Sequence, residues 1–280
     1  MRHGLLLMLT LLLAACSPEP QQHIRLLSGD WATARIMAEL ARQELEQAGF
    51  AVTVEQVPPG QIWSKLAHAE ADASLAAWLP DSSRHHAERF FDKLHDLGPN
   101  GPLLTLGLAV PVSAPLTRIS ELAGSDYGEH HITGMMPGHG SLVLTEQALA
   151  RYKLDDHELL SGSGDAYRHL VDTAIEQQTP VVIAAWSPGS VMLNPKLKWL
   201  EDDHHYFARS ERSHTLTRRG LEDSAPEAMT VLSRIRLTEP ELNDLLQRLA
   251  TEENVTLAVN KWKTERQKQE SRQVVNPSAS

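Results

Sequence analysis

The sequence predicts an α/β protein of two lobes, each built on a mainly parallel sheet with helices on its faces. The first observation is that short apolar strand patterns alternate with amphipathic helical patterns, which is the order of βαβ units. The second is that this alternation occurs in two successive sets along the 280 residues. The third is length, because about 265 residues remain after an N-terminal leader, enough for one large or two medium lobes.

The first set of elements fills the N-terminal part of the chain. Its first helix carries Ile36, Leu40 and Leu45 on one face and stops before Gly49. Its second strand alternates apolar and polar residues, as a half-buried strand does. The predicted elements are strand His23–Ser28, helix Ala32–Gln47, strand Ala51–Val57, helix Gln61–Glu70, strand Ala73–Ala77 and strand Leu104–Val110.

A second set follows, and the chain then becomes helical. The predicted elements are strand His130–Gly134, a helix from the Met135–Gly140 turn to Tyr152, strand His157–Leu160, helix Asp165–Gln177, strand Val181–Ala185, strand His214–Thr217, and helices Pro226–Arg234, Pro240–Thr251 and Val255–Lys263. We expect lobe 1 to combine residues 23–112 with 212–264, and lobe 2 to span 113–211. The chain would then cross between the lobes twice.

The first residues predict an address outside the cytoplasm. Met1-Arg2-His3 is a short positive start, and the apolar run that follows is too short to span a bilayer. It ends in Leu13-Ala14-Ala15-Cys16-Ser17, the pattern of a bacterial lipoprotein box. We therefore expect a signal peptide over residues 1–15, lipidation of Cys16 that anchors the protein to a membrane, and a tether over residues 16–22. The sequence leaves inner- and outer-membrane anchoring open.

Composition excludes several classes of function. The formal net charge is −10 with acidic and basic residues well mixed, so nucleic acid is not an expected partner. Cys16 is the only cysteine, so no intrachain disulfide can form. The chain carries no Gly-x-Ser-x-Gly, Walker or dinucleotide motif, which argues against an enzyme and against a cofactor. The polar tail, residues 265–280, is expected to be frayed or disordered.

Three tryptophans are the candidate functional residues. Trp31, Trp78 and Trp186 each follow or end a strand pattern, and the ends of buried strands point into the crevice where α/β proteins bind ligands. Several rings that meet at one point attract a cation that cannot donate hydrogen bonds. The alternative is that each tryptophan is simply a core residue. That alternative is our assignment for the other three tryptophans, Trp63, Trp199 and Trp262.

Fourteen histidines suggest a metal site as a competing interpretation. They include the doublets His85-His86, His130-His131 and His204-His205. Adjacent residues of a strand point to opposite faces, so a doublet by itself seldom chelates a metal. No His-Glu-x-x-His motif or paired cysteine spacing occurs. We therefore expect no metal site and keep a zinc-binding or other small-molecule-binding lipoprotein as the alternative function.

Eight short motifs occur in the order found in one known family. They are Trp31 at the start of the first helix, Gly60-Gln-Ile-Trp63, Ala73-Ser-Leu-Ala-Ala-Trp78-Leu-Pro80, Asp96-Leu-Gly-Pro99, Leu106-Gly-Leu-Ala-Val-Pro111, Pro137-Gly-His-Gly140, Ala185-Trp-Ser-Pro188 and His214-Thr-Leu-Thr-Arg-Arg-Gly220. Over about residues 24 to 264 the chain resembles the glycine betaine (OpuAC-like) substrate-binding proteins of ABC transporters.

The resemblance implies a fold, a ligand and a site. The fold is the two-lobed type II periplasmic-binding-protein fold, closing on a quaternary ammonium compound. The cage rings fall on Trp31, Trp78 and Trp186, and the amides that bind the ligand carboxylate fall on Gly140 and Ser141, with His139 in the same turn. Helix N-termini bind anions, which agrees with that assignment.

Two departures from the family pattern bear on specificity. Members with the Trp-Leu-Pro motif often carry a histidine shortly after it that reaches the ligand carboxylate, and that position is Ser83 here, with His85 and His86 just beyond. Ala32 follows the first tryptophan where some members have a polar residue, which favours a betaine over choline. We expect a betaine, glycine betaine first among them, delivered to an ABC permease and its ATPase.

Overall fold

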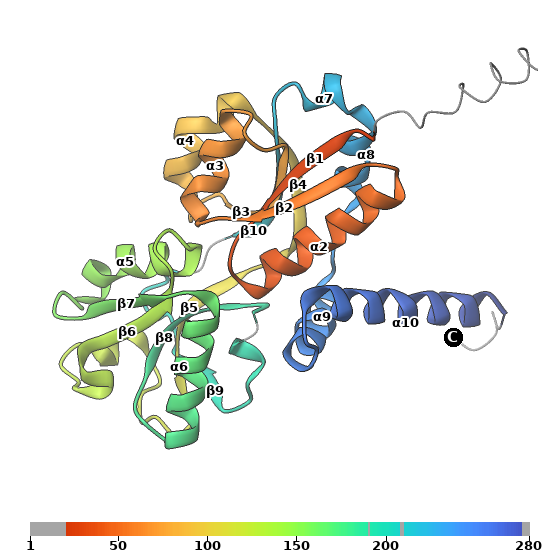
Figure 1. The fold of residues 1–280 in the computed structure, drawn as a ribbon. Coiled ribbons are helices and arrows are strands. Elements are labelled where there is room, and N and C mark those ends of the chain that lie inside the picture. Colours follow the sequence, from red (N-terminus) through yellow and green to blue (C-terminus); the bar gives the residue numbers. More distant parts are fainter. Residues whose placement is uncertain (1–20, 190, 208–209, 276–280) are drawn as a thin grey trace, which may run out of the picture.

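The computed structural model describes residues 21–189, 191–207 and 210–275. Figure 1 shows them in two lobes, one above the other. Residues 1–15, Cys16 and most of the tether lie outside the described residues. Within the described part, each lobe contains one five-stranded sheet.

The first sheet has the strand order β2-β1-β3-β10-β4. β1 runs parallel to β2 and β3, whereas β10 is antiparallel to β3 and β4. Every residue of β3 is buried, which explains its nearly continuous apolar sequence. The strands are β1 (His23–Ser28), β2 (Ala51–Gln56), β3 (Ala73–Leu79), β4 (Leu94–Leu103) and β10 (Arg212–Arg218).

The second sheet has the strand order β7-β6-β8-β5-β9. β6 runs parallel to β7 and β8, whereas β5 is antiparallel to β8 and β9. The strands are β5 (Thr105–Pro111), β6 (His131–Met135), β7 (Glu158–Gly162), β8 (Val182–Ser187) and β9 (Leu197–Trp199). The predicted two-lobed α/β class is confirmed, and each sheet adds antiparallel strands to a parallel group of three.

Helices cover the faces of both sheets. The first lobe carries α2 (Ala32–Gln47), α3 (Pro59–Ala67), α4 (Arg84–Phe90), η2 (Phe91–Lys93), α7 (Leu221–Ser224) and α8 (Pro226–Arg234). The second lobe carries η3 (Ile119–Leu122), η4 (Tyr127–His130), α5 (Gly140–Tyr152), α6 (Gly164–Gln177) and η5 (Val191–Leu193). The C-terminal helices α9 (Glu239–Thr251) and α10 (Val255–Val275) pack against α2.

The two crossings between the lobes lie side by side. The first is at Leu104, between β4 and β5, and the second is at Glu211, just before β10. The Leu104 amide donates a hydrogen bond of 2.8 Å to the Glu211 carbonyl. The first crossing comes earlier than the expected residue 112, because the strand that starts at Thr105 pairs with β8 and β9 of the second sheet.

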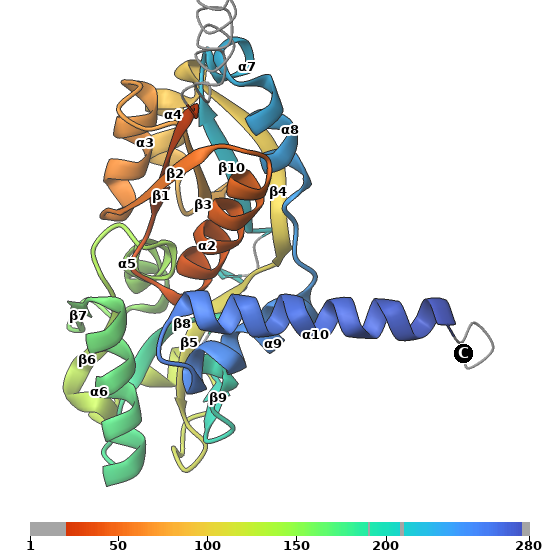
Figure 2. The same cartoon turned by 45° about the vertical axis from the view of Figure 1, so that its right-hand side comes forward.

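The expectation of a frayed or disordered tail after Trp262 is wrong as far as Val275, because α10 continues to that residue. Lysine, glutamate, glutamine and arginine have high helix propensity, so a polar sequence can still form a helix. Ion pairs tie it to neighbouring helices, since Lys263 Nζ lies 2.6 Å from Glu44 of α2 and Arg248 of α9 lies 2.8 Å from Glu265. Figure 2 shows the remaining turns projecting beyond the lobe.

Candidate ligand-binding site between the lobes

Three indole rings from two lobes meet where the lobes touch. Trp31 is the N-cap of α2 directly after β1, Trp78 lies near the end of β3, and Trp186 lies near the end of β8. The centroid of the Trp78 ring is 6.3 Å from that of Trp31 and 5.8 Å from that of Trp186. These rings form one cluster, which we call the indole cluster. Trp63, assigned to packing, is buried in the first lobe and stacks on His86 instead.

The imidazole of His139 lies inside the indole cluster. Its centroid is 4.9 Å from Trp31, 4.7 Å from Trp78 and 4.6 Å from Trp186. Burial lowers the pKa of His139 to about 3, so the ring is neutral. His139 thus comes from the second lobe and touches rings of both lobes.

Hydrogen bonds fix the orientation of the His139 ring at the start of α5. Its Nδ1 accepts a hydrogen bond of 2.9 Å from the Ser141 hydroxyl and a longer one of 3.4 Å from the Ser141 amide. In the neutral ring the proton therefore sits on Nε2, which has no hydrogen-bond partner within the described residues. The indole nitrogens of Trp31 and Trp186 also lack a partner there. Buried donors of this kind are rare in folded proteins, so three together indicate a place for an acceptor.

Gly140 allows α5 to approach the first lobe closely. A Cβ atom at this position would lie 2.4 Å from Cε3 of Trp78 and 2.8 Å from Cβ of Ser82. Glycine is therefore the residue that permits this contact in the closed arrangement of the lobes. It brings the first amides of α5, which have no partner within the helix, beside the indole cluster.

After the Trp-Leu-Pro motif, the residue that lies against Gly140 of α5 is Ser82 and not Ser83. Ser83 is the N-cap of α4, is half-buried, and makes no side-chain capping hydrogen bond. His85 is exposed, and the ring of His86 lies 6.1 Å from that of Trp63. The tight turn after Pro80 turns Ser82 inward, where only 6% of it is exposed.

Sequence reasoning missed Glu211, which holds this turn in place. Glu211 is 0% exposed and accepts hydrogen bonds from the Ser82 hydroxyl at 2.5 Å and from the amides of Asp81 at 2.5 Å and Ser82 at 3.2 Å. It lies at the second crossing, some 130 residues from Ser82 along the chain. No local sequence pattern signals such a contact, because the crossing alone brings the two segments together.

Tyr167 was also missed, and its ring packs against the indole of Trp186. Its ring stacks on the indole with centroids 6.2 Å apart and planes 20° apart, and its hydroxyl donates to the Ala184 carbonyl at 3.0 Å. A helix over Asp165–Gln177 was predicted, but a helical pattern does not distinguish a tyrosine that packs on a site from one that fills the core.

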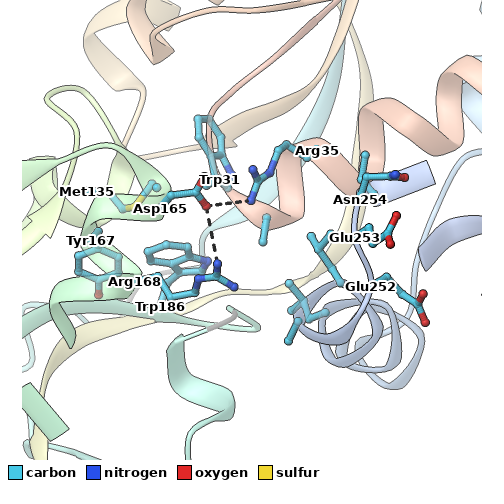
Figure 3. A pocket seen from close by; sticks show the side chains of 16 residues that line it. Trp31, Arg35, Met135, Asp165, Tyr167, Arg168, Trp186, Glu252, Glu253 and Asn254 are labelled. Atoms are coloured by element: carbon cyan, nitrogen blue, oxygen red, sulfur yellow. Dashed lines mark ion pairs between the residues drawn. The ribbon is translucent and has the colours of Figure 1, made fainter. Parts of the chain in front are cut away.

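A cavity of about 380 Å³ opens beside the indole cluster. Trp31, Trp186 and Tyr167 line one side, and the ends of α9 and α10 line the other. Figure 3 shows Asp165 at its rim between two guanidinium groups. Asp165 lies 3.7 Å from Arg35 of the first lobe and 3.9 Å from Arg168 of its own lobe. The rim is thus polar and links the lobes, while aromatic and aliphatic side chains line the interior.

Two α/β lobes closed over an aromatic site define the class of two-lobed ligand-binding proteins. The chain matches the family described as "Substrate binding domain of ABC-type glycine betaine transport system" over residues 22–265, and it belongs to that family. This is a family of transport binding proteins rather than enzymes, and binding proteins of ABC importers are extracytoplasmic. Among the described residues, no helix has the length and apolar character needed to cross a bilayer.

Individual relatives agree with the family. The chain is 28% identical over 145 residues to the glycine betaine/carnitine transport binding protein GbuC of Listeria monocytogenes serotype 1/2a (strain 10403S), a match that spans 50% of this chain and 48% of that protein. Lactococcal OpuAC, in its closed-liganded conformation complexed with glycine betaine, has a similar structure with a TM-score of 0.83 and 26% identity, covering 89% of this chain and 97% of OpuAC.

A third relative supports the fold alone. The glycine/betaine/L-proline-binding protein ProX from Borrelia burgdorferi gives a TM-score of 0.81 at 23% identity, covering 86% of this chain and 92% of that one.

Proposed function

We propose that this chain is the lipid-anchored binding protein of an ABC importer, and that it binds a quaternary ammonium osmolyte, glycine betaine first among them. It would deliver the ligand to a permease driven by an ATPase. The observation that carries the proposal is the convergence of Trp31, Trp78 and Trp186 from two lobes on one point.

The indole cluster suits the cationic end of such a ligand. A trimethylammonium group has no N–H, so hydrogen bonds cannot satisfy it, whereas the π faces of indoles attract it without competing for the ligand's own carboxylate. The His139 ring centre lies within 5 Å of all three indole centroids, inside the roughly 6 Å range of a cation–π contact. A cation at that point would therefore contact all three rings.

The start of α5 suits the anionic end. The amides of Gly140 and Ser141 belong to the first turn of a 13-residue helix, where the helix dipole favours negative charge. The indole N–H groups of Trp31 and Trp186, which have no hydrogen-bond partner among the described residues, add neutral donors nearby. Because these donors are neutral, they can hold the carboxylate without placing a second cation beside the indoles.

We propose that ligand binding displaces the His139 side chain. Its ring holds the place that the ammonium group would take, and its Nδ1 engages the Ser141 amide and hydroxyl that the carboxylate would use. Rotation of this one side chain would vacate both. Because the ring is neutral, leaving the cluster does not require a buried charge to move.

Closure of the lobes provides the signal for transport. A ligand between Trp31 and Trp78 of one lobe and Trp186 and Gly140 of the other touches all of them only when the lobes are closed. It therefore favours the closed form by the difference in contacts. The permease would recognise that form, and an anchor at Cys16, which lies outside the described residues, would keep the protein at the membrane.

Calorimetric titration of the purified protein tests the proposal. Glycine betaine, proline betaine, carnitine and choline are titrated in turn, and we expect saturable one-to-one binding of a betaine, with choline weaker. Lack of heat and of any tryptophan fluorescence change with all four ligands would contradict the assignment. Binding of zinc alone would favour the alternative of a metal-binding lipoprotein.

A further inference from the structure

A cluster of two histidines and one aspartate lies in the second lobe, away from the indole cluster. β6 and β7 run parallel, and His131 pairs with Glu158 in their register. The residues just before each strand, His130 and His157, are therefore neighbours at one end of the sheet. His139 follows the opposite end of β6, and the five residues of that strand span roughly 17 Å.

The three side chains present donor atoms at the spacing of metal ligands. One donor atom each of His130, Asp156 and His157 lies within 4.8 Å of the other two. Nδ1 of His130 is 3.2 Å from one Asp156 oxygen, and Nδ1 of His157 is 2.9 Å from the other. Ligand atoms bound to a tetrahedral zinc ion at about 2.0–2.1 Å lie roughly 3.3 Å apart, so these separations are close to those of a formed site.

Burial and hydrogen bonding also favour a bound ion over simple ion pairs. The His157 side chain is 0% exposed, and its Nδ1, the nitrogen that would bind the ion, faces Asp156 at 2.9 Å. Nδ1 of His130 is buried and, despite its 3.2 Å contact with Asp156, makes no hydrogen bond with any described residue. Nδ1 of His130 thus has a lone pair that no described residue uses, and Nδ1 of His157 faces the other oxygen of the same carboxylate, so one cation between them would contact all three groups.

The surroundings complete the arrangement. The Asp156 side chain is 60% exposed, so water could fill the remaining coordination position. A carboxylate oxygen of Asp126 lies 3.4 Å from Nε2 of His130, where it would orient the ring from behind, as carboxylates do for metal-bound histidines. Nitrogen and carboxylate donors together suit Zn²⁺ better than Ca²⁺ or Mg²⁺.

We propose that His130, Asp156 and His157 bind one Zn²⁺ ion, which clips η4 to the turn before β7. The site is separate from the betaine site, so either can exist without the other. The His130-His131 doublet alone would not form it, because Nε2 of His131 lies 3.5 Å from Glu158 instead.

Zinc titration of chelator-treated, full-length protein tests the site, read by calorimetry and by the melting temperature. We expect one equivalent of Zn²⁺ to bind and to raise the melting temperature. Asp156→Asn, at an exposed position, and His130→Ala should each weaken this binding at least tenfold. His131→Ala is the matched control and should bind zinc as the wild type does.

The outcomes separate the proposal from its rivals. Absence of stoichiometric binding by the wild type would overturn it, as would binding that survives both Asp156→Asn and His130→Ala, since the ion would then sit on other histidines. Equal weakening by His131→Ala would also overturn it. A parallel betaine titration of each variant is expected to match the wild type, so failure of the zinc site and failure of the betaine assignment are read independently.

Discussion

Replacement of Trp186 by leucine tests whether the indole cluster binds a cation. Trp186 is 3% exposed, lies 5.8 Å from Trp78 and stacks on Tyr167. A desolvated cation–π contact contributes about 2 kcal/mol. Since about 1.4 kcal/mol corresponds to a factor of ten in affinity, Trp186→Leu should raise the Kd for glycine betaine about 30-fold. Leucine keeps an apolar side chain in the site, whereas truncation of a core aromatic to alanine costs about 3–5 kcal/mol of stability.

Trp63→Leu is the matched control for this measurement. Trp63 is 2% exposed, so leucine also leaves a cavity there, but its ring neighbour is His86 and not the indole cluster. Both variants should have a lower melting temperature than the wild type. Only Trp186→Leu should lose affinity for glycine betaine in a calorimetric titration. Equal Kd values for the two variants would refute the reasoning, because affinity would then follow general packing and not the π face at residue 186.

Three further predictions concern closure and anchoring. Gly140→Ala should weaken betaine binding at least tenfold in calorimetry, because its Cβ would lie 2.4 Å from Trp78 in the closed form; unchanged affinity would contradict that contact. Burial lowers the pKa of His139 from 6.5 to about 3 in the closed form, so between these two values the closed form binds fewer protons than the open form. The free energy that favours the closed form should therefore fall by up to about 1.4 kcal/mol per pH unit as the pH drops below 6.5. X-ray scattering of ligand-free protein should then show opening at pH 5 for the wild type and not for His139→Gln. Cys16→Ser should release the protein from the membrane fraction while its affinity for betaine stays the same; retention in the membrane would contradict the lipid anchor.

Most of the helices were predicted, because apolar periodicity can be recognised within one segment of the sequence. The bounds of α2 and α8 agree with the residue ranges predicted from apolar periodicity. β4 was missed because its Gly-Pro-Asn-Gly-Pro sequence is typical of a loop. It forms a strand because it is an edge strand beside β10, where bulges around His214 accommodate Pro99.

The site was predictable only where its residues lie at the ends of sequence elements. Trp31, Trp78 and Trp186 each mark such an end. Trp31 and Trp78 converge because the parallel strands β1 and β3 end at one edge of the first sheet, whereas Trp186 meets them from β8 of the second sheet. Glu211 and Ser82 meet only because the chain crosses between lobes twice, and Tyr167 looks like any apolar residue of an amphipathic helix. The position of His139 inside the cluster depends on side-chain packing across two lobes, for which the sequence carries no pattern.

The contacts between the lobes explain why a small ligand could control closure. The Arg35–Asp165 ion pair is partly exposed, and surface pairs contribute about 0–1 kcal/mol. Gly140 and Gly164 let backbone approach Trp78 and Asp30, but they add little apolar area of their own. The indole cluster is an apolar contact between the lobes, and its centre is His139, an imidazole whose Nε2 has no partner among the described residues. Exchanging that ring for a ligand that satisfies the indoles and the α5 amides together would strengthen this contact and so favour the closed form.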